Sequence, residues 1–141
     1  MAKLDGLIKV QKHRVDEKQK ILARLYREQE EAEKRKQDIL TQIESERQVA
    51  ASLQEDALTQ LAFTNYRNNA TNRIETLDGV LENIETRIEL AQDDIRQAFE
   101  ALKKTEIVDQ NRKDTEKKQR LKKDNAELDE IGIQGHQRKK N

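Results

Sequence analysis

One run of regularly spaced apolar residues limits what this chain can fold into. Between Leu77 and Leu102, apolar residues recur at alternating intervals of four and three, with charged or amide side chains at most positions between them. This is the heptad pattern of a coiled coil, and its apolar positions, called core positions below, must be buried against a partner helix. They are Leu77, Leu81, Ile84, Ile88, Ala91, Ile95, Ala98 and Leu102, and the same phase extends back through Ile74, Ala70 and Phe63.

The beginning of the chain carries a second, weaker set of core positions that could supply the partner helix. The set starts at Leu4, runs through Val15, Leu25 and Ile39, and ends at Leu53 with the same alternating spacing. Polar residues interrupt it, and at core positions they cost stability but can fix register and partner choice. They are Gln11, Lys18, Gln29, Lys36 and Glu46. The chain contains no proline, so long helices can run uninterrupted. These patterns predict an all-α fold, a long antiparallel two-helix coiled-coil hairpin.

Two segments could hold the turn of this hairpin, residues 52–60 or the asparagine-rich residues 64–72. Phase favours the first, because Phe63 already lies on a core position of the second helix. Ser52 followed by Glu55 or Asp56 also offers the cap of a helix start. We therefore expect a single domain over residues 1–141, with helix 1 at about 4–54, the turn at about 54–58 and helix 2 at about 59–130.

The end of the chain departs from this pattern. Beyond Leu102 the apolar residues Ile107, Leu121 and Leu128 follow a different register. Residues 131–141 have two glycines and no periodicity, and we expect a frayed tail there.

Composition argues against catalysis and membrane insertion. The chain has no cysteine, and its two histidines, His13 and His136, are isolated on polar segments, so we predict no metal site, no cofactor and no enzyme activity. No apolar run approaches the roughly 20 residues that cross a bilayer, and the N-terminus lacks the apolar region of a secretory signal. We expect a cytoplasmic protein without direct membrane insertion.

Charge is distributed unevenly although the net charge is zero. Residues 1–36 hold 11 basic against 7 acidic side chains, and residues 111–141 hold 10 against 6. The intervening parts of both predicted helices are acidic. Folding the chain back at the predicted turn would bring both basic segments to the open end of the hairpin, the end opposite the turn. The basic open end could be a docking surface, or only the solvated face of a soluble coiled coil.

Several stretches resemble the FliJ family, the stalk of the flagellar type III export apparatus, which is related to stalk proteins of the injectisome. They are KVQKHRVDEKQKILARL near the start, Tyr66 near the turn, QAFEALKKTEI at 97–107 and LDEIGI at 128–133. The resemblance covers nearly the whole chain. It implies a noncatalytic stalk, similar to the central stalk of rotary ATPases, for flagellum biogenesis and protein transport. Such a protein would lie at the flagellar base on the inner face of the membrane.

The resemblance also implies partners and contact residues. The partners would be the hexameric type III export ATPase, the cytoplasmic domain of the export gate, and export chaperones. The family's gate-contacting stripe falls here on Arg73, Leu77, Val80 and Ile84, of which Leu77 and Ile84 are also core positions. The ATPase would meet the open end, whose positive charge is carried by Lys9, Lys12, Arg14, Lys117, Lys118, Arg120 and Lys122.

Two other functions were weighed. A nucleic-acid-binding protein would need a larger basic excess and aromatic residues for base stacking, which the basic tail lacks, so we predict no nucleic-acid partner. A self-associating coiled-coil adaptor or scaffold fits the core positions equally well, and a measured mass would separate it from a monomeric hairpin.

Overall fold

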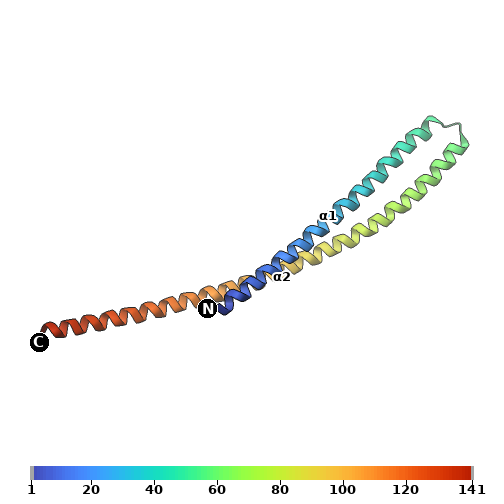
Figure 1. The fold of residues 1–141 in the computed structure, drawn as a ribbon. Helices are drawn as coiled ribbons and strands as arrows, with labels where there is room; N and C mark the ends of the chain where they lie inside the picture. Colours follow the sequence, from blue (N-terminus) through green and yellow to red (C-terminus); the bar gives the residue numbers. More distant parts are fainter. Residues whose placement is uncertain (1, 141) are drawn as a thin grey trace. The chain divides into compact units, whose positions relative to one another are not determined.

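The computed structural model describes residues 2–140 of the chain, and the side chains of residues 4–138. It consists of two α-helices, α1 (Ala2–Ser52) and α2 (Ala57–Lys140), without a strand among the described residues (Figure 1). The two helices pack against each other, which confirms the predicted fold class. Contacts divide the chain into two compact units: unit 1 is Met1–Val15 with Gln97–Asn141, and unit 2 is Asp16–Arg96.

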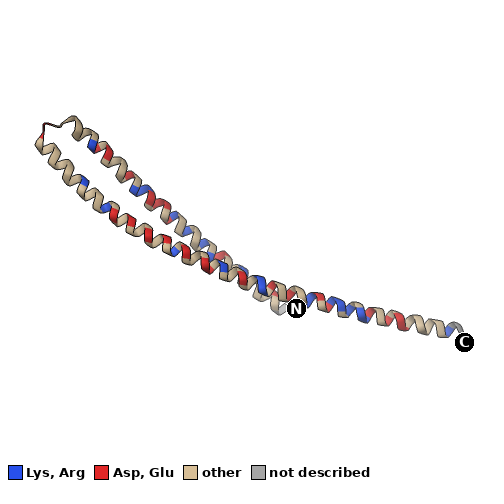
Figure 2. Cartoon of the chain, turned by 180° about the vertical axis from the view of Figure 1, so that it is seen from behind, with Lys and Arg blue, Asp and Glu red and all other residues tan. Residues whose placement is uncertain are grey.

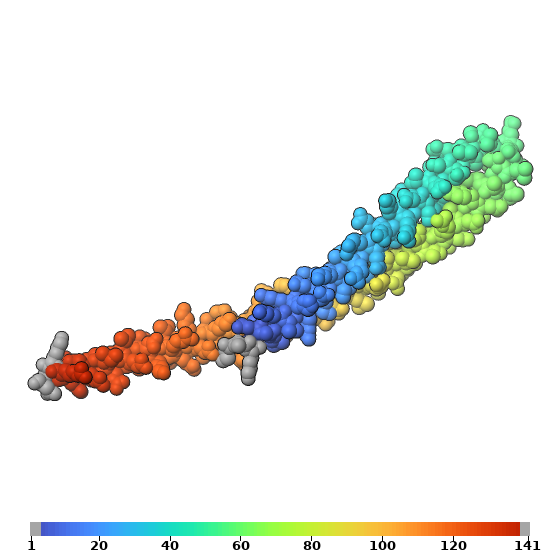
Figure 3. Space-filling view, in the orientation of Figure 1, coloured from blue at the N-terminus to red at the C-terminus, as the bar shows by residue number. Residues whose placement is uncertain are grey.

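Unit 2 holds most of the buried apolar residues. Its central cluster consists of Leu25, Ala32, Ile84, Ile88 and Ala91, with Leu22 and Leu81 packed against it. All seven are predicted core positions. Figure 3 shows side chains of α1 (blue to cyan) and α2 (green to yellow) meeting along this unit. Burying these side chains removes apolar surface from water, and this stabilises the pairing of the two helices.

Contacts between polar side chains show that the helices of unit 2 run antiparallel. Lys36 Nζ lies 2.7 Å from Asp78 Oδ1, and Tyr26 Oη accepts a hydrogen bond of 2.9 Å from Gln92 Nε2. A partner later in α2 thus faces a residue earlier in α1. All four side chains are exposed or half-buried, so each contact adds little energy, yet together they match the register of the apolar cluster.

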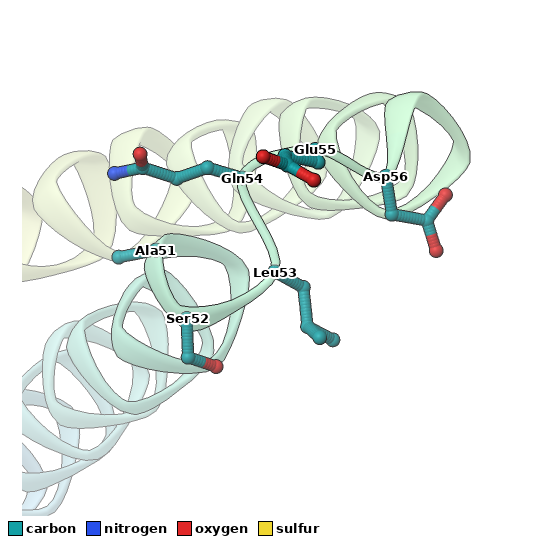
Figure 4. Close-up of a pocket in the computed structure, with 6 residues that line it drawn as sticks. All are labelled: Ala51, Ser52, Leu53, Gln54, Glu55 and Asp56. Carbon is teal, nitrogen blue, oxygen red and sulfur yellow. The ribbon is translucent and has the colours of Figure 1, made fainter.

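The turn between the helices is short, as the close-up of residues 51–56 shows (Figure 4). Asp56 is the N-cap of α2, because its Oδ1 accepts hydrogen bonds from the backbone N–H groups of Leu58 (3.1 Å) and Thr59 (3.4 Å). Ser52, the other predicted cap residue, instead donates to the carbonyl of Val49 in the last turn of α1. Leu53, expected at a core position, is 49% exposed because α1 has already ended.

Unit 1 has a much thinner core than unit 2. Among its residues with described side chains, those buried are the apolar Val15 on α1 and Leu102 on α2 and the polar Asp109. The register predicted to change after Leu102 continues instead. Thr105, Asp109 and Glu116 lie in the same heptad phase and are at least partly buried, although Arg112, the intervening position of that phase, is exposed. Ile107, Leu121 and Leu128 are also exposed. Polarity at these positions concealed the continuing phase from a search for apolar residues.

The C-terminal part of unit 1 also differs from expectation. The sequence pattern predicts that helix ends near residue 130, but α2 continues to Lys140. Every described side chain from 117 to 138 is exposed, which means that this part of α2 has no helix packed against it. Glycine lowers helix propensity by only about 1 kcal/mol, so Gly132 and Gly135 do not by themselves end a helix whose other residues favour it.

Candidate binding surfaces

The basic residues predicted for the open end are exposed in unit 1. Lys9, Lys12 and Arg14 lie on α1, and Lys117, Lys118, Arg120 and Lys122 lie on α2. None of the seven forms an ion pair with another described residue. Figure 2 shows Lys and Arg positions (blue) on the C-terminal part of α2. The four α2 residues therefore lie on a stretch of helix that is exposed on every side. The three α1 residues lie on the part of unit 1 in which α1 packs against α2.

Another basic residue of unit 1, Lys113, forms ion pairs with acidic side chains of both helices. Lys113 Nζ lies 2.9 Å from Asp109 Oδ2 and 3.9 Å from Asp5 Oδ1 on α1. The pKa of Lys113 is raised above its ordinary value, chiefly by the hydrogen bond to Asp109. The charge of Lys113 is thus balanced by acidic residues of the same unit, unlike that of the seven residues above. The position of Lys113 opposite Asp5 marks where α1 begins beside α2.

Two buried oxygen atoms in unit 1 have no hydrogen-bond partner among the described residues. They are Oδ1 of Asp109 and Oε1 of Gln11. Both belong to polar residues on core positions. A buried acceptor without a donor costs about 1–3 kcal/mol, so this layer weakens the packing of α1 on α2 in unit 1.

The residues predicted to contact the export gate fall in unit 2 and differ in accessibility. Arg73 is exposed, Val80 is 44% exposed, and Leu77 is half-buried. Ile84 is only 4% exposed and belongs to the central apolar cluster, so its side chain cannot reach a partner while the helices are packed. Ile84 is therefore not accessible to a partner in the packed hairpin, because it occupies a core position in the cluster that α2 forms with α1. The gate contacts of Arg73, Leu77 and Val80 stay a prediction.

A groove between the helices of unit 2 includes two of the predicted gate residues. Its α2 side is formed by Tyr66, Arg73 and Leu77, and its α1 side includes Arg35, Asp38 and Ile39. Ile39, Tyr66 and Leu77 are half-buried and form an apolar floor, while the charged residues are exposed at the rim. Among described residues, Arg35 and Arg73 have no ion-pair partner within 4.0 Å.

The α1 side of this groove was not predicted. Ile39 and Leu77 are both core positions, but a sequence does not show which residue of one helix faces which residue of the other. The sequence did indicate that Arg35 and Ile39 share one face of α1, because they are four residues apart, which is about one helical turn.

The described part of the chain contains no group of three or more His, Cys, Asp or Glu side chains able to hold a metal ion. No helical stretch within it has both the length and the apolar character of a membrane span. The surfaces described above are therefore the strongest candidates for function.

Comparison with known proteins gave one informative result. No curated protein and no solved structure matched the chain. The family model described as the flagellar FliJ protein matched residues 1–141, the whole sequence. The chain therefore belongs to the FliJ family, the flagellar export stalk family, as its sequence motifs and its helical hairpin fold indicate.

Proposed function

We propose that this chain is a noncatalytic stalk that couples the hexameric export ATPase to the export gate of the flagellar type III apparatus. Family membership supports a role in flagellar export. In this proposal the basic residues of unit 1 bind the ATPase, and Arg73, Leu77 and Val80 of unit 2 bind the cytoplasmic domain of the gate. Export chaperones are further partners, and the protein acts at the inner face of the membrane at the flagellar base.

The observation that carries the ATPase assignment is the uncovered basic segment of α2. Lys117, Lys118, Arg120 and Lys122 are exposed, form no ion pair with another described residue, and lie on a stretch of α2 whose described side chains are all exposed. Residues 117–138 hold six basic against four acidic side chains. An excess of charge of one sign on a narrow element steers it toward a surface of opposite sign and speeds association. A single helix is also narrow enough, at about 10–12 Å with its side chains, to enter the channel of an oligomeric ring.

Charge reversal at defined positions tests this assignment. Changing Lys9, Lys12 and Arg14 to Glu, and separately the four α2 residues to Glu, should slow association with the ATPase and reduce stimulation of ATP hydrolysis. Reversal of Arg24, Arg27 and Lys34 is a matched control, because these are exposed basic residues of α1 in unit 2. Wild-type association should slow as salt rises, since exposed charges are screened beyond about 8 Å at physiological ionic strength.

The gate assignment needs a separate measurement. Arg73→Glu and Val80→Asp should weaken binding to the cytoplasmic domain of the gate and leave ATPase stimulation unchanged.

If both charge-reversal variants of unit 1 retained wild-type ATPase binding and salt dependence, the proposed orientation would be wrong. The acidic turn would then be the better candidate for the ATPase contact.

A further inference from the structure

We infer that the C-terminal part of α2, residues 117–131, pairs antiparallel with the same segment of a second copy of this chain. The pairing goes beyond the proposed stalk function, and only its consequence for the ATPase rests on that function. Every described side chain from 117 to 138 is exposed, so no helix of the same chain packs on this segment. An isolated helix is only marginally stable in water, and a partner helix would stabilise it.

An apolar face on this segment is open to a partner. It consists of Leu121, Leu128 and Ile131, each more than half exposed. Spacings of seven and three residues bring them within about 80° of one another around the helix. Leu121 lies about 140° around α2 from Glu116, which is half-buried in the phase of the core positions. The apolar face is therefore not the one that packs against α1.

The order of charges on the segment identifies a second copy as the partner. Residues 117–123 hold five basic and no acidic side chains, and residues 124–130 hold four acidic and no basic ones. Figure 2 shows a blue stretch followed by a red one toward the C-terminus. An antiparallel pair sets the basic block of each copy against the acidic block of the other, whereas a parallel pair sets like against like. Charges beside the apolar positions decide partner and orientation in coiled coils, so the segment is complementary to itself in the antiparallel direction.

The apolar face and the charges agree on one register. Centring the pair just after Asp124 places Leu121 of each copy opposite Leu128 of the other. In this register Lys122 of each copy lies level with Glu127 of the other. The paired stretch of 15 residues is about 22 Å long, or about four turns. So short a contact makes the association weak and reversible, and dependent on protein concentration.

The pairing has a consequence for the proposed ATPase contact. It sets acidic side chains against the basic residues that this proposal assigns to the ATPase, which are Lys117, Lys118, Arg120 and Lys122. One copy therefore cannot present this segment to a second copy and to the ATPase at the same time. Self-pairing thus competes with ATPase binding and neutralises the basic segment of the free protein.

The self-association is tested on the full-length protein by sedimentation equilibrium at low salt. Its average mass should rise with concentration from monomer toward dimer, and the dimer should weaken as salt screens the charges. Leu128→Asp should raise the dissociation constant at least about tenfold, because each pair contains this apolar contact twice. Leu90→Asp is the matched control, because Leu90 is an exposed leucine of unit 2 and should leave the mass unchanged. Circular dichroism should show the main melting transition unchanged in Leu128→Asp, because residue 128 lies outside the apolar core.

The direction of pairing is tested by disulfide formation. The chain has no cysteine of its own, so introduced cysteines report on single positions. Lys118→Cys and Gly132→Cys lie level with each other in the antiparallel pair, and a mixture of the two variants should form the mixed disulfide under mild oxidation. A parallel pair would instead join Lys118→Cys to itself.

The outcomes separate the pairing from the function proposed above. A protein that stayed monomeric at its highest soluble concentration, or a dimer unaffected by Leu128→Asp, would overturn the inference, as would symmetric disulfides alone. If the dimer formed as expected, adding the isolated ATPase should dissociate it, and Leu128→Asp should bind the ATPase more tightly than the wild type. An ATPase that left the dimer intact would contradict the ATPase assignment of the α2 residues, while the pairing itself would stand.

Discussion

The side chain of Gln60, in the first turn of α2, donates a hydrogen bond of 2.7 Å to the backbone carbonyl of Ala50, near the end of α1. The same Nε2 lies 3.3 Å from the carbonyl of Leu53. The Ala50 carbonyl also accepts the backbone N–H of Leu53 (3.1 Å), and the Leu53 carbonyl accepts that of Asp56 (3.1 Å), so Gln60 adds a second donor to each acceptor at the end of α1. Ala50 itself is only 4% exposed, and the bond therefore ties the turn to the end of the apolar core.

Ile88 lies in the central apolar cluster and is 7% exposed. Ile88→Ala should lower the free energy of unfolding of unit 2 by about 2–4 kcal/mol, because it removes buried methyl groups and leaves a cavity. Circular dichroism during urea or thermal unfolding would measure the change. Leu90→Ala is the matched control, since Leu90 is 61% exposed two residues away and should change stability by less than about 0.5 kcal/mol. Equal effects at the two positions would contradict the observed packing.

Gly79 lies within α2, and a Cβ built at this position meets no atom within 4 Å. Gly79→Ala should therefore raise stability by about 0.5–1 kcal/mol, because alanine restricts the unfolded chain without a clash in the helix. The same thermal melts would report it. Gly132→Ala serves as the comparison, because Gly132 lies on a part of α2 that packs against no other helix. This substitution should raise helix content at most and leave the main melting transition unchanged. A drop in stability for Gly79→Ala would indicate a close contact at that face.

Asp56 should make the stability of the turn depend on pH. Its hydrogen bonds with Thr59 hold the pKa of the carboxyl below its ordinary value of 3.8. A depressed pKa in the folded state means that the stabilisation is present above the ordinary value and is lost as pH falls through the lower folded value. Asp56→Asn keeps a good N-cap without this titration, so the loss of stability below about pH 4 should be smaller than in the wild type.

Glu44, whose pKa is lowered mainly by its hydrogen bond to Arg47, contributes to pH dependence in the same direction. The informative quantity is consequently the difference between wild type and Asp56→Asn, measured by thermal unfolding from pH 2 to pH 7. Identical pH profiles for the two proteins would show that the cap does not carry the effect.

Asp109 should weaken unit 1. Its Oδ1 is buried without a donor, and its ion-pair partner Lys113 is half-exposed and can be solvated by water once the pair is removed. Asp109→Leu should therefore stabilise the packing of α1 on α2 in this unit by about 1 kcal/mol. Hydrogen exchange of the amides of residues 4–15 would report it as slower exchange. Glu100→Leu, at an exposed position of the same unit, should have no such effect. Faster exchange in Asp109→Leu would show that the ion pair outweighs the unmet hydrogen bond.

Most of the fold could be predicted because the spacing of apolar residues along the sequence shows which positions are buried between the helices. Leu25, Ala32, Ile84 and Ile88 were identified as core positions from heptad phase alone, and the structure buries all four. Polar occupants hide such positions, as at Thr105 and Asp109, since a search for periodic apolar residues stops where the apolar residues stop. The length of α2 was underestimated for a related reason, because residues 131–140 have no periodicity and yet few strong helix breakers.

The candidate binding surfaces were only partly accessible to sequence reasoning. The basic residues of unit 1 could be found, because exposed charge on a helix needs no partner to be recognised. The groove could not, because its composition depends on the pairing of Arg35 and Ile39 with residues of α2 that lie more than 25 positions away in the chain. The family resemblance supplied Arg73 and Leu77 but no α1 residue.

The turn contains no residue with a positive φ and no glycine, which has a consequence for how related sequences can vary. No position in it demands a particular backbone conformation that only glycine adopts easily. A residue added or deleted within the helices on either side of the turn, however, would rotate the core positions beyond it by about 100°. Related proteins should therefore vary in length more readily within the turn itself, and natural insertions within α1 or α2 should come in multiples that restore the heptad phase.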